Sequence, residues 1–302
     1  MIVLGAGVSG LAVGMASGAP VFEAAAGPGG LCSSYYVRPG GAERLARPPT
    51  DAEAYRFEVG GGHWIFGGDP EVLARLDALV HAMADACDVR YGHRAVAIDP
   101  VAREVGFDDG SSAGYTELVS TLPLVDMVRL AGLTVEGEPD PHTSVLVLNI
   151  GAERGPCHPD QHWIYQPHSA SGHHRIGFCS NVDESFLPSS ARRAHDRSAV
   201  YVERAYRGGD VPTAAEQSVF TDAVVAELQS SGYLGAVDVV DPTWIDVAYT
   251  WSWPRSTWRA RALDALAAHG IHQVGRFARW SFQGIADSVK EGLQAGTARR
   301  AA

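Results

Sequence analysis

A glycine-rich turn between two short apolar runs, near the start of the chain, constrains the fold more than any other feature. Residues 2–4 are Ile-Val-Leu and lead directly into GAGVSGL at 5–11, and a second apolar pair, Val21-Phe22, ends at Glu23. The order of strand, tight turn, helix, strand and acid is typical of a dinucleotide-binding βαβ unit. The sequence therefore predicts a parallel α/β sheet that begins at residue 2.

The glycines and the acid of this motif have distinct predicted roles. Gly5 permits the tight turn, Gly7 lets the backbone approach a pyrophosphate, and Gly10 lets the helix pack closely on the strand. The N–H groups at the helix N-terminus attract phosphate through their partial positive charge. Glu23 is predicted to accept hydrogen bonds from ribose hydroxyls, and its charge repels a 2′-phosphate, which disfavours NADP.

Length and composition limit the class of protein. The chain has 302 residues, of which 46% are hydrophobic, enough for a sizeable core in one large domain or two modest ones. The formal net charge of −11 disfavours nucleic-acid binding, because that binding uses Lys and Arg to neutralise phosphates. No apolar run approaches the roughly 20 residues that span a bilayer. No basic residue precedes Arg38, so a signal peptide is not predicted and a cytoplasmic location is expected.

Further glycine motifs give the chain a resemblance to a known superfamily. AAAGPGGL at 24–31 follows Glu23, EVGGGHWI occupies 58–65, and VGRFARW at 274–280 precedes a helix-like stretch from about Gly284 to Gly296. In these features the chain resembles the FAD-binding superfamily of amine oxidases, protoporphyrinogen oxidases and UDP-galactopyranose mutases. In that superfamily a second glycine pair follows the ribose acid, and a Gly-Arg segment and a helix close the chain.

The resemblance implies that the cofactor is FAD. The FAD is expected to be noncovalent, because the C-terminal Gly-Arg segment contains no cysteine. The C-terminal helix is expected to point its N-terminus at the pyrimidine end of the isoalloxazine, where it would stabilise negative charge on the reduced ring. With the first motif, the expected cofactor-binding residues are Gly5, Gly7, Val8, Ser9, Gly10, Glu23, Ala24, Gly29, Gly30, Leu31, Gly61, Gly62, His63, Trp64, Thr121, Gly275, Arg276, Gly284 and Ile285.

The same resemblance implies the domain organisation. It predicts an α/β protein with a Rossmann-type (GR2-like) FAD-binding domain over residues 1–68, 88–136 and 262–302. A smaller α+β substrate domain with an antiparallel sheet is predicted over 137–261, where apolar runs alternate with turns. Residues 69–87 are predicted to form a shortened helical connection. Residues 94–98 and 104–107 are predicted to form a hairpin closed by Asp108-Asp109-Gly110.

The chain is short for the superfamily it resembles. The missing part lies between His63 and residue 94, where larger relatives hold a helical part of the substrate domain. We therefore expect either a more open flavin face or a face covered by a second copy of the chain or by a partner enzyme. Many amine oxidases of this superfamily carry a lysine near flavin N5. The single lysine of this chain, Lys290, instead falls in the expected C-terminal helix, so the resemblance disfavours ordinary amine oxidation.

Catalytic and substrate residues are less strongly indicated. His63 is the catalytic candidate, either as a hydrogen-bonding or proton-transferring group near the flavin or as a packing residue against Trp64. The substrate candidates, taken from the resemblance, are Tyr165, Arg175, Asn181, Tyr249 and Arg255. An arginine among them either binds a phosphate or carboxylate or pairs with a surface acid.

A run of histidines and cysteines in the middle of the chain invites a metal-site interpretation. The stretch from Cys157 to Cys179 contains both cysteines and histidines at 158, 162, 168, 173 and 174. Their spacing matches no zinc-ligand pattern, so no metal site is predicted.

Three functions remain open at this point. The favoured one is an FAD-dependent oxidoreductase acting on a small metabolite, in specialised-metabolite or sugar-related biosynthesis, with hydride transfer to or from flavin N5. The first alternative is a redox-neutral nucleotide-sugar mutase resembling UDP-galactopyranose mutase, which would require arginines for a nucleotide diphosphate. The second is a non-catalytic flavin-binding accessory protein.

Overall fold

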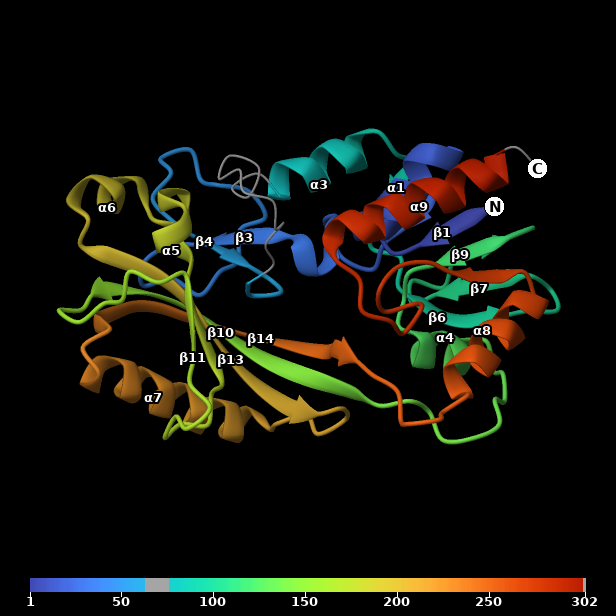
Figure 1. Cartoon of the computed structure of the whole chain (residues 1–302). Helices are drawn as coiled ribbons and strands as arrows, with labels where there is room; N and C mark the ends of the chain where they lie inside the picture. Colours follow the sequence, from blue (N-terminus) through green and yellow to red (C-terminus); the bar gives the residue numbers. More distant parts are fainter. Residues whose placement is uncertain (63–75, 301–302) are drawn as a thin grey trace. The chain divides into compact units, whose positions relative to one another are not determined.

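The computed structural model describes residues 1–62 and 76–300, so His63 and Trp64 lie outside the described residues (Figure 1). The chain forms two compact units. Unit 1 comprises Met1–Cys32, Leu76–His142 and Tyr249–Ala302, and unit 2 comprises Ser33–Arg75 and Thr143–Ala248. Each unit has its own sheets and is described by itself.

Unit 1 is built on a five-stranded sheet in which every pair of neighbours is parallel. Its strands in spatial order are β15 (Ile271–Gln273), β9 (Leu118–Ser120), β1 (Ile2–Leu4), β2 (Val21–Phe22) and β5 (Val89–Arg90). The strand order reverses at β1, because β2 follows on one side of it and β9 lies on the other. In open parallel sheets, ligands bind outside the carboxyl ends of the strands at such a reversal.

Two helices of unit 1 pack against each other through glycines. α1 (Val8–Ser17) and α9 (Ile285–Arg300) run side by side in Figure 1. A Cβ atom at Gly292 would lie 2.4 Å from the carbonyl oxygen of Ser9, and one at Gly296 would lie 2.6 Å from that of Val13. Only glycine at these two positions permits this close helix contact. The other helices of the unit are α3 (Leu76–Asp85), α4 (Leu124–Leu130) and α8 (Trp258–Ala268), and a short 3-10 helix, η1, spans Gly30–Cys32.

A small antiparallel sheet in unit 1 consists of β6 (Ala95–Asp99), β7 (Glu104–Phe107) and β8 (Ser112–Gly114). The hairpin of β6 and β7 forms as predicted, but its predicted turn was wrong. The chain between Asp99 and Glu104 already closes that hairpin, and the turn at 108–110 leads from β7 into β8.

Unit 2 is built on a five-stranded sheet with one face covered by a helix. Its strands in spatial order are β11 (Trp163–Tyr165), β12 (Arg175–Phe178), β13 (Arg197–Arg207), β10 (His142–Arg154) and β14 (Leu234–Thr250). The helix is α7 (Ala214–Ser230), which starts with a capping box between Thr213 and Glu216. Its buried side chains, among them Phe220 and Val224, join those of alternate strand residues in one apolar core.

The hairpin of β3 (Ser34–Val37) and β4 (Tyr55–Glu58) also belongs to unit 2. Asn149 of β10 ties it to the large sheet, because its side-chain nitrogen donates to the Tyr35 hydroxyl at 2.9 Å and to the Glu58 carbonyl at 3.1 Å. The remaining short elements in the described part of the unit are α5 (Cys179–Val182), η2 (Glu184–Phe186) and α6 (Ser189–Ala194).

The unit boundaries differ from the predicted domains. Residues 33–62 lie in unit 2, whereas residues 76–87, 137–142 and 249–261 lie in unit 1. The boundaries differ because long-range contacts, which a local sequence pattern does not predict, determine them. One such contact is the hydrogen bond of 3.2 Å from the Trp251 N–H to the Pro141 carbonyl. No helix in the described part of the chain is both long and apolar enough to cross a membrane.

Candidate functional site

The turn from β1 into α1 lies at the carboxyl edge of the parallel sheet and depends on two glycines. Gly5 adopts φ +95°, and a Cβ atom there would lie 2.3 Å from Oγ1 of Thr121. A Cβ atom at Gly10 would lie 1.9 Å from the Gly5 carbonyl oxygen. The fold itself therefore requires both glycines. Thr121 donates its hydroxyl to the Leu4 carbonyl at 3.0 Å and so fixes the end of β1.

Gly7 differs from its two neighbours in the motif, because the fold does not require glycine there. Its φ is −72°, and a Cβ atom would have no neighbour closer than the Gly29 carbonyl oxygen at 4.0 Å. Gly7 is the N-cap of α1, no side chain of the described segments caps this helix, and its first turn contains no acid. The N–H groups of Val8 and Ser9 therefore begin an uncapped helix N-terminus that suits an anion.

The second glycine pair lies against this turn. Gly7 and Gly29 form a parallel bridge, and the Gly29 N–H donates to the Ala6 carbonyl at 2.8 Å. Gly30 adopts φ +56°, and a Cβ atom there would lie 3.7 Å from the Cα of Gly7. Leu31 follows in η1. Two motifs that are separate in the sequence thus form one cradle of backbone groups, which we call the glycine cradle.

Glu23 follows β2 at the same edge of the sheet, close to the glycine cradle. Its carboxylate oxygens accept backbone hydrogen bonds from Ala6 at 2.7 Å and from Ala25 at 2.8 Å. Each carboxylate oxygen can accept about two hydrogen bonds, so these contacts orient the group and leave capacity for hydroxyl donors.

A cleft of about 480 Å³ opens beside Glu23 and Ala24. This volume is in the range of small-molecule sites. Sequence analysis did not identify several of the residues that line it: His93, Arg94, Val96, Leu122, Pro123 and Arg129. His93 and Arg94 follow β5, and Leu122 and Pro123 follow β9, whereas Val96 lies in β6 and Arg129 in α4. For the first four, the signal that could have found them is the carboxyl end of each parallel strand. Because β5 has only two residues, that signal is weak in the sequence.

The C-terminal motif begins beside α1. Gly275 adopts φ +94°, and a Cβ atom there would lie 2.4 Å from Oγ of Ser9. Its N–H donates to Glu291 of α9 at 3.0 Å. At the start of α9, the Gly284 N–H donates to Asp287 at 3.3 Å, and Ile285 is the first helical residue. The negative charge of Asp287 lies in the first turn of this helix and offsets part of its positive end.

Arg276 is held by aromatic side chains. Its guanidinium carbon lies 4.8 Å from the centre of the Phe282 ring, 5.5 Å from that of Tyr249 and 5.7 Å from that of Phe277. Burial lowers the pKa of the Arg276 guanidinium, and Tyr249 acts in the opposite direction. The structure thus brings together a predicted cofactor residue, Arg276, and a predicted substrate residue, Tyr249.

Unit 2 brings two other substrate candidates together. Tyr165 of β11 and Arg175 of β12 are direct cross-strand partners, and the guanidinium carbon lies 6.0 Å from the Tyr165 ring centre. Arg175 also donates to both carboxylate oxygens of Glu203 on β13, one of them at 3.0 Å. Gly61 lies against the same sheet face, because a Cβ atom there would be 3.0 Å from Oε1 of Glu203. Gly62 follows it at the end of the described segment.

The last two substrate candidates, Asn181 and Arg255, lie outside this group of side chains. The Asn181 side-chain nitrogen donates to the carbonyls of Pro159 at 2.7 Å and Gln161 at 2.9 Å. Both N–H groups of the amide are therefore used to hold the loop before β11. Arg255 lies exposed on the loop between β14 and α8, with φ +67°. In the described part of the chain, no group of three or more His, Cys, Asp or Glu side chains could hold a metal ion.

Comparison with known proteins gives structural relatives only. No family model matches the chain, and no curated protein is similar to it in sequence. A reduced UDP-galactopyranose mutase superposes with a TM-score of 0.72 at 16% identity, over 97% of this chain and 94% of that one. A protoporphyrinogen oxidase-like protein of an Exiguobacterium species gives 0.65 at 11% identity, over 99% and 98%. A CLA-producing fatty acid isomerase of P. acnes gives 0.57 at 10% identity, over 98% and 97%.

These superpositions cover both chains nearly end to end, so the likeness concerns the whole fold. They confirm the resemblance predicted from the glycine motifs at the level of the fold. The predicted α/β class is confirmed as a mixed fold with one parallel and several antiparallel sheets. The chain has the fold shared by UDP-galactopyranose mutase, the protoporphyrinogen oxidase-like protein and the fatty acid isomerase.

Proposed function

We propose that this protein is an FAD-dependent oxidoreductase whose unit 1 is a Rossmann-type, GR2-like domain that binds FAD noncovalently. The main support for this proposal is the presence of a glycine at position 7. The fold does not need a glycine there, yet Gly7 starts an uncapped helix and touches the second glycine pair. A glycine without an internal reason is explained by a ligand that must approach the backbone, and a pyrophosphate suits this helix end.

The other residues of unit 1 fit the remaining parts of such a cofactor. Glu23 has acceptor capacity for ribose hydroxyls, and the adjoining cleft of about 480 Å³ has room for a nucleoside. Arg276 supplies positive charge for the pyrophosphate, and its aromatic neighbours hold it without cancelling that charge. Bound FAD would supply hydride transfer at its N5 atom.

The substrate is proposed to be a small metabolite of specialised or sugar-related biosynthesis, without a diphosphate group. Arg175 is paired with Glu203, and Arg197 is paired with Asp238 at 2.9 Å and with Asp196 at 3.2 Å. Arginines that are already matched by carboxylates are poor receptors for a nucleotide diphosphate. For Arg175 and Arg197, this pairing favours the oxidoreductase over the mutase. Tyr165, exposed beside Arg175, remains the proposed substrate contact of this sheet face.

The first experiment is the visible absorption spectrum of the purified protein, with mass analysis of any cofactor released by heat. Flavin bands and released FAD would support the cofactor. Reduction of that FAD by a substrate under anaerobic conditions would support the oxidoreductase. Activity only with reduced flavin and without net redox change would favour the mutase. A colourless protein that takes up no added FAD would contradict the proposal.

Two parts of the proposal concern other proteins. A second copy of the chain or a partner enzyme is proposed to cover an open flavin face, and light scattering of the FAD-loaded protein tests this. A monomer with a solvent-protected flavin would contradict it. Stable co-purification with a larger enzyme, without turnover by the chain alone, would instead favour the accessory-protein function.

A further inference from the structure

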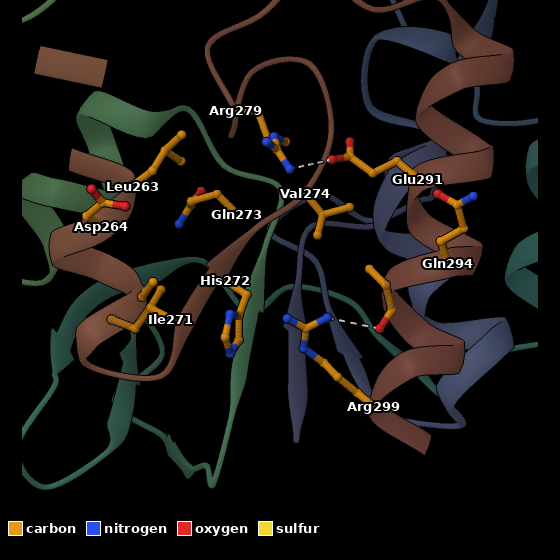
Figure 2. Close-up of a pocket in the computed structure, with 12 residues that line it drawn as sticks. Leu263, Asp264, Ile271, His272, Gln273, Val274, Arg279, Glu291, Gln294 and Arg299 are labelled. Atoms are coloured by element: carbon orange, nitrogen blue, oxygen red, sulfur yellow. Dashed lines mark hydrogen bonds and ion pairs between the residues drawn. The ribbon is translucent and has the colours of Figure 1, made fainter. Parts of the chain in front are cut away.

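A second cleft in unit 1 is lined by strand β15, which lies at the edge of the parallel sheet (Figure 2). Its volume is about 450 Å³, in the range of small-molecule sites. Residues of α8, including Leu263 and Asp264, lie on one side, and residues of α9, including Glu291, lie on the other. It shares no lining residue with the cleft beside Glu23.

Gln273, the last residue of β15, is the most informative residue of this cleft. Its exposed fraction is only 8%, and among the described residues neither its side-chain nitrogen nor its side-chain oxygen has a hydrogen-bond partner. Figure 2 shows this side chain between Leu263 and Val274, in the middle of the lining residues. Buried amides in native proteins are almost always hydrogen-bonded, because an unpartnered one loses its water without compensation. An amide that lines a cleft in this state points to a ligand that completes it.

The charges around Gln273 indicate what kind of ligand this is. Arg279 is paired with Glu291 at 3.0 Å, and Arg299 is paired with Glu117 at 3.3 Å. Burial, followed by the charge of Arg299, lowers the pKa of His272, and Glu117 acts in the opposite direction, so the net effect favours the neutral imidazole. The two arginines are thus matched by carboxylates, and Asp264 adds a further carboxylate to the lining, so the cleft offers no net positive charge to an anion. A neutral ligand fits these surroundings best.

We propose that this cleft binds a neutral, planar molecule with an adjacent donor and acceptor, of the carboxamide type, through Gln273. A carboxamide and the Gln273 amide each carry N–H donors and a carbonyl acceptor. Two antiparallel N–H···O bonds between them satisfy both buried atoms at once. The site uses no residue of the glycine cradle, so it stands independently of FAD binding.

The test measures binding of benzamide by titration calorimetry or ligand-observed NMR, with benzoate as the matched probe. Benzoate has the same ring but a negative charge and no N–H donor. We expect benzamide to bind at least tenfold more tightly than benzoate. Gln273→Met keeps the side-chain length and removes the amide, so at least a tenfold loss of benzamide affinity is expected. Gln161→Met, at an exposed glutamine of unit 2, is the control and is expected to bind like the parent protein.

A second variant covers the case in which Gln273→Met does not fold. Leu263→Trp fills the cleft from α8 without altering the amide, and it is also expected to abolish benzamide binding. Added FAD is expected not to displace benzamide, which distinguishes this cleft from the glycine cradle. The proposal is overturned if the parent protein does not bind benzamide or binds benzoate equally well. Displacement by FAD, or unchanged benzamide affinity in a folded Gln273→Met variant, overturns it as well.

Discussion

The guanidinium carbon of Arg276 lies 5.5 Å from the centre of the Tyr249 ring, within unit 1. An aromatic ring attracts a guanidinium without cancelling its charge, whereas a carboxylate cancels it. Arg175 of unit 2 shows the second arrangement, because Glu203 receives two of its N–H groups. Arg276 and Arg175, both singled out from the sequence, therefore differ in their surroundings. Arg276 lies among aromatic rings, whereas Arg175 is paired with a carboxylate.

The first prediction concerns these aromatic contacts of Arg276. Arg276→Gln should raise the Kd for FAD by about 10- to 100-fold, because a charge-assisted hydrogen bond contributes about 1.5–3 kcal/mol. Tyr249→Leu should raise it only about 2- to 5-fold, since a partly exposed cation–π contact contributes about 0.5–1 kcal/mol. Fluorescence titration of the apoprotein with FAD measures both constants. Tyr165→Leu in unit 2 is the control, and a larger effect there than at Tyr249 would contradict the assignment.

The second prediction separates glycines that serve a ligand from glycines that serve the fold. Gly7→Ala should weaken FAD binding at least about tenfold, because the new methyl group would occupy the approach of the pyrophosphate. Its Tm should fall by no more than about 2 °C, because alanine at an N-cap costs only about 0.5 kcal/mol relative to glycine. Gly10→Ala should instead lower the Tm strongly, because its Cβ atom would lie 1.9 Å from a carbonyl oxygen.

Gly114→Ala provides the matched control for Gly7→Ala. Gly114 lies in β8 of the same unit, and a Cβ atom there would have no neighbour closer than 3.9 Å. The control should change neither the FAD affinity nor the Tm by more than the experimental error. Equal FAD affinity of Gly7→Ala and Gly114→Ala would mean that the glycine cradle does not bind a pyrophosphate.

The parts of the fold that follow from local physics could be predicted from the sequence. The spacing from residue 2 to Glu23 determines β1, α1 and β2, because a tight turn and a close helix each require a glycine at one place. The start of α9 at Ile285 follows from the glycine before it. The position of β3 and β4 in unit 2 could not be predicted, because it depends on Asn149, about ninety residues further along the chain.

The candidate site shows the same division. Gly5, Gly7, Gly29 and Glu23 lie together because they belong to neighbouring segments of one short βαβ stretch, whereas the cleft residues His93 and Leu122 follow two strands that are distant in the sequence. Asn181 has a role that the resemblance did not predict, since its amide holds the loop before β11. Whether a polar side chain binds a ligand or its own backbone depends on the conformation of neighbouring loops, which residue type alone does not encode.

The third prediction concerns the ion pair of Arg175 and Glu203. The Glu203 side chain is 2% exposed and that of Arg175 is 18% exposed, so removing one partner leaves a largely buried charge. Glu203→Gln should therefore lower the free energy of unfolding by about 3–5 kcal/mol. The double variant Arg175→Met with Glu203→Leu should recover most of this loss, because no buried charge remains. Urea unfolding measures the free energy of unfolding of the parent protein, of Glu203→Gln and of the double variant. A double variant no more stable than Glu203→Gln would show that the loss comes from packing and not from the unpaired charge.

The fourth prediction is the dependence of stability on pH. Burial lowers the pKa of four histidines: His158, His173, His174 and His272. The most buried of them is His173, whose side chain is 0% exposed. Its Nδ1 lies 2.7 Å from the Ser171 hydroxyl oxygen, and its Nε2 lies 2.6 Å from the Gln166 side-chain oxygen. Glu227, 3.9 Å away, partly opposes the effect of burial.

The direction of the effect follows from proton binding. Below about pH 6.5, the ordinary pKa of histidine, the unfolded chain binds protons that the folded chain resists, so acid favours unfolding. The histidine contribution is therefore complete above about pH 6.5 and is lost as the pH falls toward the lowered pKa values of the folded state. Urea unfolding at pH 7.5, 6.5 and 5.5 measures how steeply the free energy of unfolding changes with pH. His173→Asn should reduce it, whereas His168→Asn, at an exposed histidine of the same loop, should not. Equal slopes in both variants would place the pH dependence outside the buried imidazole of His173.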